Sequence, residues 1–285
     1  MLEAVHSHFP EIYSFCSSAY SQPTLLKYGD RVIYSREGVQ QGDPLGPLLF
    51  SLTIHPLLTD LTSPFRIGYL DDLTLGGPDA TVADDIEKVM VGGAELGLKL
   101  NISKCEIISE SHYHGHALLD SFIHKTASQA ELLGASLISG DAMISKLEKH
   151  SADLQRASVR LMGIQRHDAL ILLRHSLSAP KVMHTLRTSP CSQHPLLLIL
   201  DKILRDCLCN LLNSDLSEDQ WPQASLPVRR GGLCIRSFSQ LAPSAFLSSY
   251  NATRELQLLI LANCATSVGA DFMPRLSLRG AANSK

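Results

Sequence analysis

Asp71 and Asp72 are the residues whose type and position best suit a chemical role. Short apolar runs at residues 67–70 and 73–75 flank them, so we expect a β-hairpin that carries both carboxylates at its tip. Carboxylate oxygens suit Mg²⁺, which keeps several waters and often takes further ligands from substrate phosphates. Two such ions can stabilise the attacking and the leaving oxygen of a phosphoryl transfer. The alternative for an isolated Asp-Asp pair is a solvated turn without chemistry.

A second aspartate pair, Asp84 and Asp85, illustrates that alternative. Both residues fit the acidic first turn of a helix, where negative charge is favourable, and we assign them no chemistry. Three histidines at alternate positions are a further candidate, because alternate side chains of a strand share one face and imidazoles can bind Zn²⁺. For His112, His114 and His116 we favour an exposed loop over a zinc site.

Four segments resemble the conserved blocks of reverse transcriptases, the RNA-dependent DNA polymerases. The YLDD segment at residues 69–72 resembles the YxDD box, and GVQQGDPLGPLLF at 38–50 resembles the QGDP block. LGLKLNISKCE at 96–106 is similar to the G-L-x-x-N-x-x-K-C block, and LLG at 132–134 is similar to the turn of the primer-grip strand. Because the blocks occur in the family's order, the chain is identified as a member, of the non-LTR (LINE-like) retrotransposon type.

The resemblance implies roles for residues at the hairpin and in the QGDP block. Asp71 would be a catalytic metal ligand, with Asp72 assisting beside it. Tyr69 would pack near the primer terminus. Gln41 and Gly42 would line the pocket for the template and the incoming nucleotide, where a glycine lets the backbone approach closely.

The other two blocks each contribute one residue with an implied role. Lys104 would lie near the triphosphate and offset charge on the leaving group, and Gly134 would lie in the primer-grip turn. The implied cofactor is Mg²⁺ or Mn²⁺, with two ions in the intact family. The implied partners are an RNA template, a DNA primer and dNTP. The sequence leaves the oligomeric state open.

The family's two-metal site also needs a carboxylate from a block that precedes the QGDP block. The residues before that block offer acidic side chains that do not lie in such a motif: Glu3, Glu11, Asp30 and Glu37. We therefore expect a chain that is truncated at its N-terminal side, without this aspartate and the fingers, and inactive alone. The alternative is a non-catalytic module derived from a retroelement that binds nucleic acid or protein, or a decayed element without function.

The spacing of apolar and turn residues predicts the elements that position these residues. We expect a helix at residues 1–5, and a hairpin of residues 24–28 and 31–34 around Gly29 and Asp30. Further helices are expected from Asp43, its N-cap, to about residue 58, with a possible kink at Pro56, and from a cap at Asp79 to Gly97. Strands are expected at 105–108 and 132–138.

The pattern changes after Gly140, where apolar residues follow a 3.5-residue spacing: Ile144, Leu147, Leu154 and Leu161. Helices are predicted from there on, with breaks near Pro180, Pro190, Pro222, Pro227 and Pro243. The predicted fold is α+β. A partial reverse-transcriptase palm, an antiparallel sheet with helices, occupies residues 1–140, and an all-helical, thumb-like region occupies residues 141–285.

The overall charge gives little support to nucleic-acid binding. The net charge is -3 and the sequence pI is about 6.4, although a local basic groove is compatible with both values. Lys146, Lys149, Arg229 and Arg230 are candidate phosphate contacts, against the alternative of solvated surface charge. The arginine pair lies in LPVRRGGL (226–233), which resembles a block that follows the polymerase region in some non-LTR retrotransposons.

Cysteine usage and hydropathy suggest a cellular setting. The seven cysteines are scattered without a CxxC pair, which favours a reduced protein over a disulfide scaffold. The richest apolar run, residues 196–200, is too short to span a membrane, and no signal peptide is evident. We expect an intracellular protein, nuclear or cytoplasmic, without a membrane partner.

Overall fold

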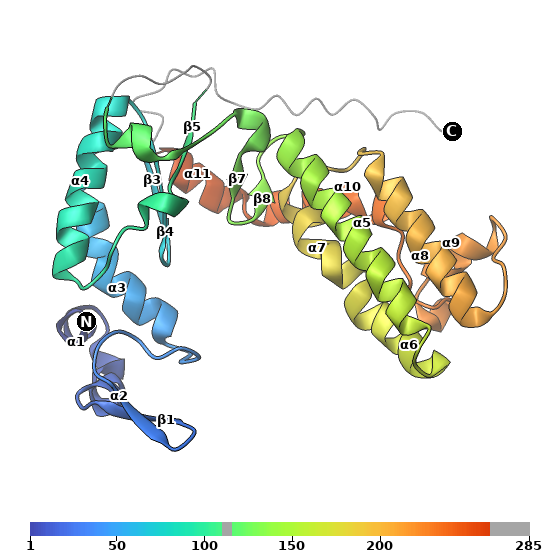
Figure 1. Ribbon diagram of the computed structural model, residues 1–285, viewed down its shortest axis with the longest axis horizontal. Coiled ribbons are helices and arrows are strands. Elements are labelled where there is room, and N and C mark those ends of the chain that lie inside the picture. The colour runs from blue at the N-terminus through green and yellow to red at the C-terminus, as the bar shows by residue number, and fades with distance from the viewer. Residues whose placement is uncertain (110–115, 263–285) are drawn as a thin grey trace. The chain divides into compact units, whose positions relative to one another are not determined.

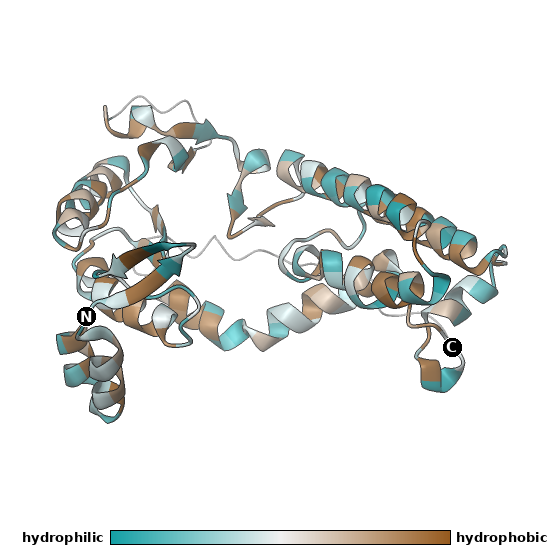
Figure 2. Cartoon of the chain, turned by 60° about the horizontal axis from the view of Figure 1, so that its bottom comes forward, coloured by the Kyte–Doolittle hydropathy of each residue, from teal (hydrophilic) through white to brown (hydrophobic). Residues whose placement is uncertain are grey.

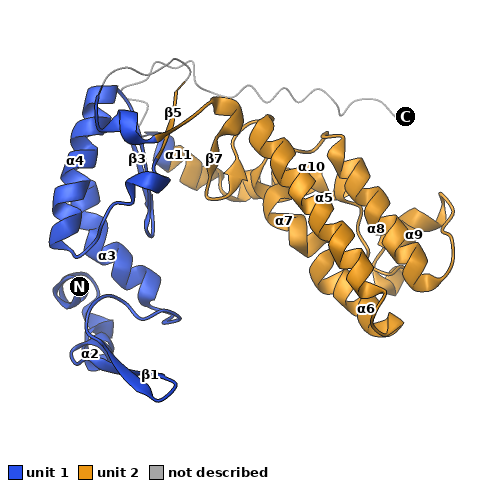
Figure 3. Ribbon diagram, viewed as in Figure 1, with its two compact units in different colours: residues 1–105, 114–122, 260–285 blue, residues 106–113, 123–259 orange. Residues whose placement is uncertain are grey.

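The computed structural model describes residues 1–109 and 116–262 (Figure 1). Its described residues divide into two compact units (Figure 3). Unit 1 holds residues 1–105 and 116–122 with 260–262, and unit 2 holds 106–109 with 123–259. Helices and short sheets together give the α+β class that the sequence predicts. The domain boundary at residue 140 stays a prediction.

Unit 1 alternates helices with β-hairpins along the chain. Its elements are α1 (Leu2–His8), α2 (Pro10–Tyr20), β1 (Thr24–Tyr28), β2 (Arg31–Ser35), α3 (Gly46–Thr59), β3 (Phe65–Tyr69), β4 (Asp72–Gly76) and α4 (Asp79–Glu95), followed by 3-10 turns at Ile102–Lys104 and Leu119–Ser121. β1 pairs with β2 and β3 with β4, both antiparallel. Both predicted hairpins are therefore confirmed.

Two predicted helix caps in unit 1 are wrong. α3 begins at Gly46 with Leu45 at its N-cap, and Pro47 occupies the first turn. The Asp43 side chain instead accepts a hydrogen bond from the backbone N–H of Leu45 at 2.8 Å, within the turn before the helix. α4 begins at Asp79 itself, after Pro78, so this carboxylate lies in the first turn, where it still complements the helix dipole.

The β1–β2 hairpin keeps large apolar side chains exposed, and neighbours along a strand, such as Leu25 and Leu26, lie on opposite faces. Figure 2 colours its hydrophobic residues brown. The exposed residues are Leu25, Leu26, Tyr28, Val32, Ile33 and Tyr34. The small core at the start of unit 1 forms instead around Val5, Cys16 and Leu49, which join α1, α2 and α3. A two-stranded hairpin with both faces exposed has little stability of its own. Because no buried face selects the register of its strands, the strand pairing and the turn at Gly29 and Asp30 must do so.

Unit 2 begins with short strands and continues with helices. Its elements are β5 (Glu106–Ile108), β6 (Ile123–Lys125), β7 (Glu131–Leu132), β8 (Ala135–Ser136), α5 (Asp141–Leu161), α6 (Arg166–Leu172), α7 (Ala179–Thr188), α8 (Leu196–Leu212), α9 (Gln220–Ser225), α10 (Phe238–Ala252) and α11 (Arg254–Ala262), whose last three residues are counted with unit 1. One-turn segments add Ala127–Gln129, a π turn at Leu173–Leu177, and Val228–Arg230.

The strands differ from the expected palm sheet. Among the described residues they form four separate two-stranded pairs, and β5 pairs with β6 in parallel. One continuous antiparallel sheet is therefore not confirmed. The single strand predicted at 132–138 is wrong, because Leu133 (φ 49°) and Gly134 (φ 71°) reverse the chain between β7 and β8. Both positive φ values suit a two-residue hairpin turn.

The helical core of unit 2 confirms most of the predicted stripe on α5. Leu147, Leu154 and Leu161 are buried against the other helices, whereas Ile144 is 40% exposed and Met143 takes the buried position. One predicted break is wrong, because Pro243 lies inside α10 as its sixth residue. The break near Pro222 is confirmed, since α9 begins at Gln220, two residues before it. Pro243 has no N–H to donate to the carbonyl of Ser239, so α10 lacks one hydrogen bond in its second turn and continues beyond it.

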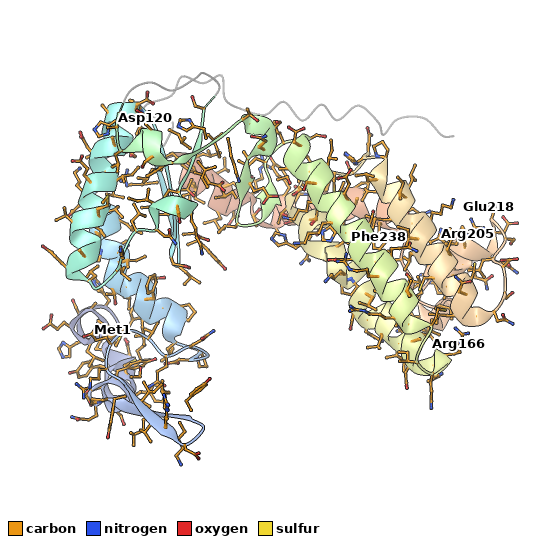
Figure 4. The ribbon with its side chains drawn as sticks, in the orientation of Figure 1. Met1, Asp120, Arg166, Arg205, Glu218 and Phe238 are labelled. Atoms are coloured by element: carbon orange, nitrogen blue, oxygen red, sulfur yellow. The ribbon has the colours of Figure 1, made fainter. Side chains whose placement is uncertain are left out.

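Asp201 on α8 fixes the start of α10 by accepting hydrogen bonds with both carboxylate oxygens. Oδ1 accepts from the N–H of Phe238 at 2.5 Å, and Oδ2 accepts from the hydroxyls of Ser237 (2.7 Å) and Ser239 (2.5 Å). Asp201 is buried, and Phe238 beside it is among the largest fully buried residues (Figure 4). A buried charge is tolerated when its lone pairs are satisfied in this way.

We expect Asp201→Asn to lower the free energy of unfolding of unit 2 by about 2–4 kcal/mol, because one acceptor oxygen becomes a donor that faces other donors. Trp221, the chain's only tryptophan, packs against this core, so its fluorescence in a urea titration reports on unit 2. Asp206→Asn is the control, since Asp206 is an exposed carboxylate of the same helix. Equal losses in the two variants would contradict the anchoring role.

His150 on α5 is a half-buried imidazole whose Nε2 lies 2.9 Å from the hydroxyl of Thr185 on α7. Burial lowers the pKa of His150, and the positive charges of Lys146, Lys181 and Lys149 lower it further, with Asp153 acting in the opposite direction. In the folded state His150 therefore binds a proton less readily than in the unfolded chain, whose histidines titrate near pH 6.5.

We expect the free energy of unfolding of unit 2 to fall as pH drops from about 7 towards about 5, because the unfolded chain then takes up a proton at residue 150 that the folded state disfavours. His150→Gln should reduce this pH dependence, measured as the urea midpoint of Trp221 fluorescence at both pH values. His167→Gln, at an exposed position on α6, should leave it unchanged. A pH dependence that His150→Gln does not alter would contradict this assignment.

Candidate active site

The β3–β4 hairpin places Asp71 and Asp72 at its tip, as predicted. Tyr69 pairs with Asp72 in register, so Leu70 and Asp71 form a two-residue turn. Leu70 has a φ of 56°, a left-handed conformation that costs a non-glycine residue roughly 1–2 kcal/mol. Both aspartates are exposed, and Tyr69 is 59% exposed. The tip thus presents a phenol ring and two carboxylates to solvent from one rigid turn.

The hairpin lies close against α3 through a glycine. A Cβ atom at Gly68 would lie 2.6 Å from Cδ1 of Leu58, near the end of α3. On the opposite strand, a Cβ atom at Gly76 would lie 3.4 Å from Cβ of Phe65, which is ordinary van der Waals contact. A side chain at residue 68 would displace the flexible end of the Leu58 side chain, so the glycine allows the present close contact.

Asp85 fixes the segment that leads into β3. Its carboxylate accepts hydrogen bonds from the N–H and hydroxyl groups of Thr62 and Ser63 at 2.6–3.0 Å, and Lys88 pairs with it at 3.0 Å. Burial alone would raise the pKa of Asp85, but the hydrogen bonds from Ser63, Lys88 and Thr62 together hold it well below its ordinary value. The assignment of Asp85 to an exposed acidic first turn is therefore wrong.

Sequence reasoning missed Asp85 although a signal existed. Residue 85 lies three residues after Val82 and four before Val89, which places it on the apolar stripe of α4. A carboxylate on the buried face of a helix requires partners, and the Thr-Ser pair before β3 supplies them.

The loop before α3 holds Gln41 and Gly42. Tyr20 of α2 donates its hydroxyl to Asp43 and accepts the N–H of Gln40 at 3.3 Å. The hydrogen bonds from Tyr20 and from the backbone of Leu45 lower the pKa of Asp43. Both Gln41 and Gly42 are exposed, and Gly42 has a φ of 91° that favours glycine. The loop ends are thus fixed while its middle stays open to solvent.

The remaining predicted site residues lie elsewhere. Lys104 is exposed at the end of the turn Ile102–Lys104, also in unit 1. Gly134 lies in unit 2, in the β7–β8 turn, where its carbonyl accepts a hydrogen bond from the ammonium group of Lys146. The structure therefore brings Tyr69, Asp71 and Asp72 together on one hairpin. Gln41 and Gly42 share the loop before α3, and Lys104 and Gly134 each lie on a further segment.

The chemistry of the hairpin tip fits a hard cation in part. Its two carboxylates offer the oxygen ligands that Mg²⁺ prefers. Within residues 1–109 and 116–262, no group of three or more His, Cys, Asp or Glu side chains is arranged to hold a metal ion. Further ligands would have to come from substrate, water or other protein residues. Of the three histidines considered for zinc, His112 and His114 lie outside the described residues.

Comparison with known proteins identifies the segment that carries this hairpin. Residues 5–137 match the family model described as reverse transcriptase (RNA-dependent DNA polymerase). This segment belongs to the reverse transcriptase family. The matched residues include the YLDD hairpin, the QGDP loop and Lys104. The family predicted from the sequence is therefore confirmed.

Two retrotransposon proteins are similar to this chain. The retrotransposable element SLACS 132 kDa protein of Trypanosoma brucei gambiense is 26% identical over 224 residues, covering 74% of this chain and 18% of that protein. The Retrovirus-related Pol polyprotein from type-1 retrotransposable element R2 of Popillia japonica is 28% identical over 120 residues, covering 38% and 20%. Both support a non-LTR reverse transcriptase. The chain spans about a fifth of the length of these relatives.

The similarity to the SLACS protein reaches beyond the reverse transcriptase segment. A share of 74% of the chain exceeds residues 5–137, so the aligned residues include part of the helical region. No solved structure matches the chain significantly. Among the residues that the structure describes, no helix has the length and apolar character needed to cross a membrane.

We expect Tyr20→Phe to raise the pKa of Asp43 towards its ordinary value, because the tyrosine hydroxyl makes the largest contribution to lowering it. A ¹³C NMR titration of the aspartate carboxyl groups measures this change. Tyr13→Phe on the same helix should leave Asp43 unchanged. An unchanged pKa in Tyr20→Phe would show that Tyr20 does not hold the loop.

Proposed function

We propose that the β3–β4 hairpin is the catalytic hairpin of an RNA-directed DNA polymerase. The observation that carries the proposal is the pair of exposed carboxylates on a two-residue turn, inside a segment of the reverse transcriptase family. In this proposal Asp71 and Asp72 hold divalent cations, Mg²⁺ or Mn²⁺. When bound, these cations offset negative charge on the phosphates of the incoming nucleotide. The residues of the chain position the reactants around them.

The residues near the carboxylates would bind the template, primer and nucleotide. Tyr69, exposed beside the carboxylates, would pack against the primer terminus through its ring face. Gln41 and Gly42 would line the pocket for the template base and incoming dNTP, where the open loop has no side chain at residue 42. Lys104 would neutralise charge on the triphosphate, and Gly134 would support the primer strand.

We further propose that residues 1–285 are catalytically incomplete when tested alone. Two carboxylates are the acidic ligands that the hairpin tip supplies, and the described residues bring together no set of three potential ligands. Loss of one ligand shared by both cations should lower the rate on the order of a thousandfold or more. The second candidate function is a non-catalytic module that binds nucleic acid or protein.

We expect no Mg²⁺-dependent extension of a DNA primer on an RNA template by residues 1–285. Extension should appear when a segment that carries the family's aspartate block is fused to the N-terminal side of these residues. In that fusion, Asp71→Asn should lower the extension rate by at least about a thousandfold. Gel-resolved extension with labelled primer measures both.

Asp84→Asn is the matched control, because Asp84 is an exposed carboxylate of the same unit without a proposed role. It should leave the extension rate unchanged. Robust extension by residues 1–285 that depends on Asp71 would overturn the proposed incompleteness. Extension by the fusion that survives Asp71→Asn would overturn the catalytic assignment.

A further inference from the structure

We propose that the arginine turn, residues 226–232, binds the phosphate groups of a nucleic-acid backbone through Arg229 and Arg230. The turn lies in unit 2, whereas the catalytic hairpin lies in unit 1. The choice of nucleic acid as the ligand rests on the proposed function. The existence of a preformed cationic site rests on the structure of the turn alone.

Backbone hydrogen bonds fix the arginine turn against α9. The N–H of Arg230 donates to Pro227 at 2.8 Å and that of Gly231 donates to Val228 at 2.9 Å, which closes the one-turn helix. Leu226 accepts the N–H of Cys234 at 2.9 Å, and Ala224 of α9 accepts that of Leu233 at 2.9 Å. Both ends of the turn are thus tied to α9 or to each other.

Two glycines make this conformation possible. Gly231 has a φ of 78°, which a larger residue adopts only with strain. A Cβ atom at Gly232 would lie 2.1 Å from the carbonyl oxygen of Leu226, a distance that no side chain tolerates. After the glycines, Ile235 is fully buried in the core of unit 2. The arginine pair is therefore presented by a backbone that is fixed before any ligand arrives.

The side chains of Arg229 and Arg230 point their charge at solvent. Both are exposed, and neither forms an ion pair with a carboxylate of the described part of the chain. Arg205 on α8 differs, because it pairs with Glu218 at 2.8 Å (Figure 4). No carboxylate among the described residues offsets the charge of Arg229 or Arg230, so each guanidinium group is available to an anion.

The guanidinium group suits phosphate as a ligand, and the proposed function selects phosphate over carboxylate. A guanidinium group offers several N–H donors in a planar fork that matches phosphate oxygens, and adjacent residues can contact successive phosphates. Because the turn is already fixed, little backbone entropy is lost on binding. The alternative is a pair of solvated charges without a ligand, and the second alternative is an acidic protein segment. Both are outcomes of the test below.

The test measures binding of the whole chain to labelled nucleic acids by fluorescence anisotropy, without metal ion or dNTP. The probes are single-stranded RNA, an RNA–DNA hybrid and double-stranded DNA, at salt concentrations from about 50 to 200 mM. Arg229→Gln/Arg230→Gln should weaken binding about tenfold at the lower salt. It should also reduce the slope of log K against log salt by about 1.4–1.8, corresponding to two phosphates. The relative losses on the probes distinguish RNA from DNA.

The matched control is Arg160→Gln/Arg166→Gln, which removes the same charge from exposed arginines at the end of α5 and the start of α6. Arg166 is labelled in Figure 4. It should retain most of the affinity. Arg229→Lys/Arg230→Lys keeps the charge but not the fork, and should recover only part of the loss. Melting followed by Trp221 fluorescence checks that each variant is folded.

Equal effects of the two glutamine variants would overturn the proposal, since only net charge would then matter. Unchanged nucleic-acid affinity would overturn it too, and a simultaneous loss of binding to a polyglutamate peptide would assign the turn to an acidic protein. If the wild-type chain binds none of the probes at low salt, the arginine turn fails as a nucleic-acid site. The primer-extension test of Asp71 in the fusion protein is independent of these results.

Discussion

Both candidate sites depend on a buried carboxylate that is saturated with hydrogen bonds. Asp85 holds residues 62 and 63, which lead into the β3–β4 hairpin. Asp201 holds the start of α10, three residues after the buried Ile235, which follows the arginine turn. Transfer of an ion from water costs several kcal/mol unless the protein replaces its hydration. Each carboxylate recovers this cost from loop N–H and hydroxyl donors, and so determines where the loop lies.

The carboxylates proposed to bind cations have the opposite environment. The side-chain carboxylates of Asp71 and Asp72 are exposed and accept no hydrogen bond from the residues that the structure describes. Their oxygens are therefore available to a cation, whereas those of Asp85 and Asp201 are fully used. The register of the hairpin, the left-handed Leu70 and the contact of Gly68 with Leu58 fix their backbone. A rigid backbone with unsatisfied carboxylates is the arrangement that hard cations require.

Net charge is a poor guide to the ligands of this chain. A formal charge of -3 gives no general attraction for nucleic acid. Charge is nevertheless distributed unevenly, because Arg205 is neutralised by Glu218 while Arg229 and Arg230 have no such partner in the described part of the chain. Around His150 the charges are mixed, because Lys146 pairs with Glu131 and Lys181 pairs with Asp153. The ion pairs of individual side chains, and not the net charge of the chain, decide where an anion can bind.

The family, the hairpin at Asp71 and Asp72, and the helical character of residues 141–262 could be predicted from the amino-acid sequence. These follow from short-range patterns: strand–turn–strand spacing, a 3.5-residue apolar stripe, and motif order. Four features could be seen only in the folded chain: Asp85 is buried, Ile144 is exposed, Pro243 lies inside a helix, and Gly232 lies against the carbonyl of Leu226. Each of these depends on a partner that is distant in the sequence or on the exact direction of a side chain. Local propensity does not encode such partners, because burial is set by what packs on the other side.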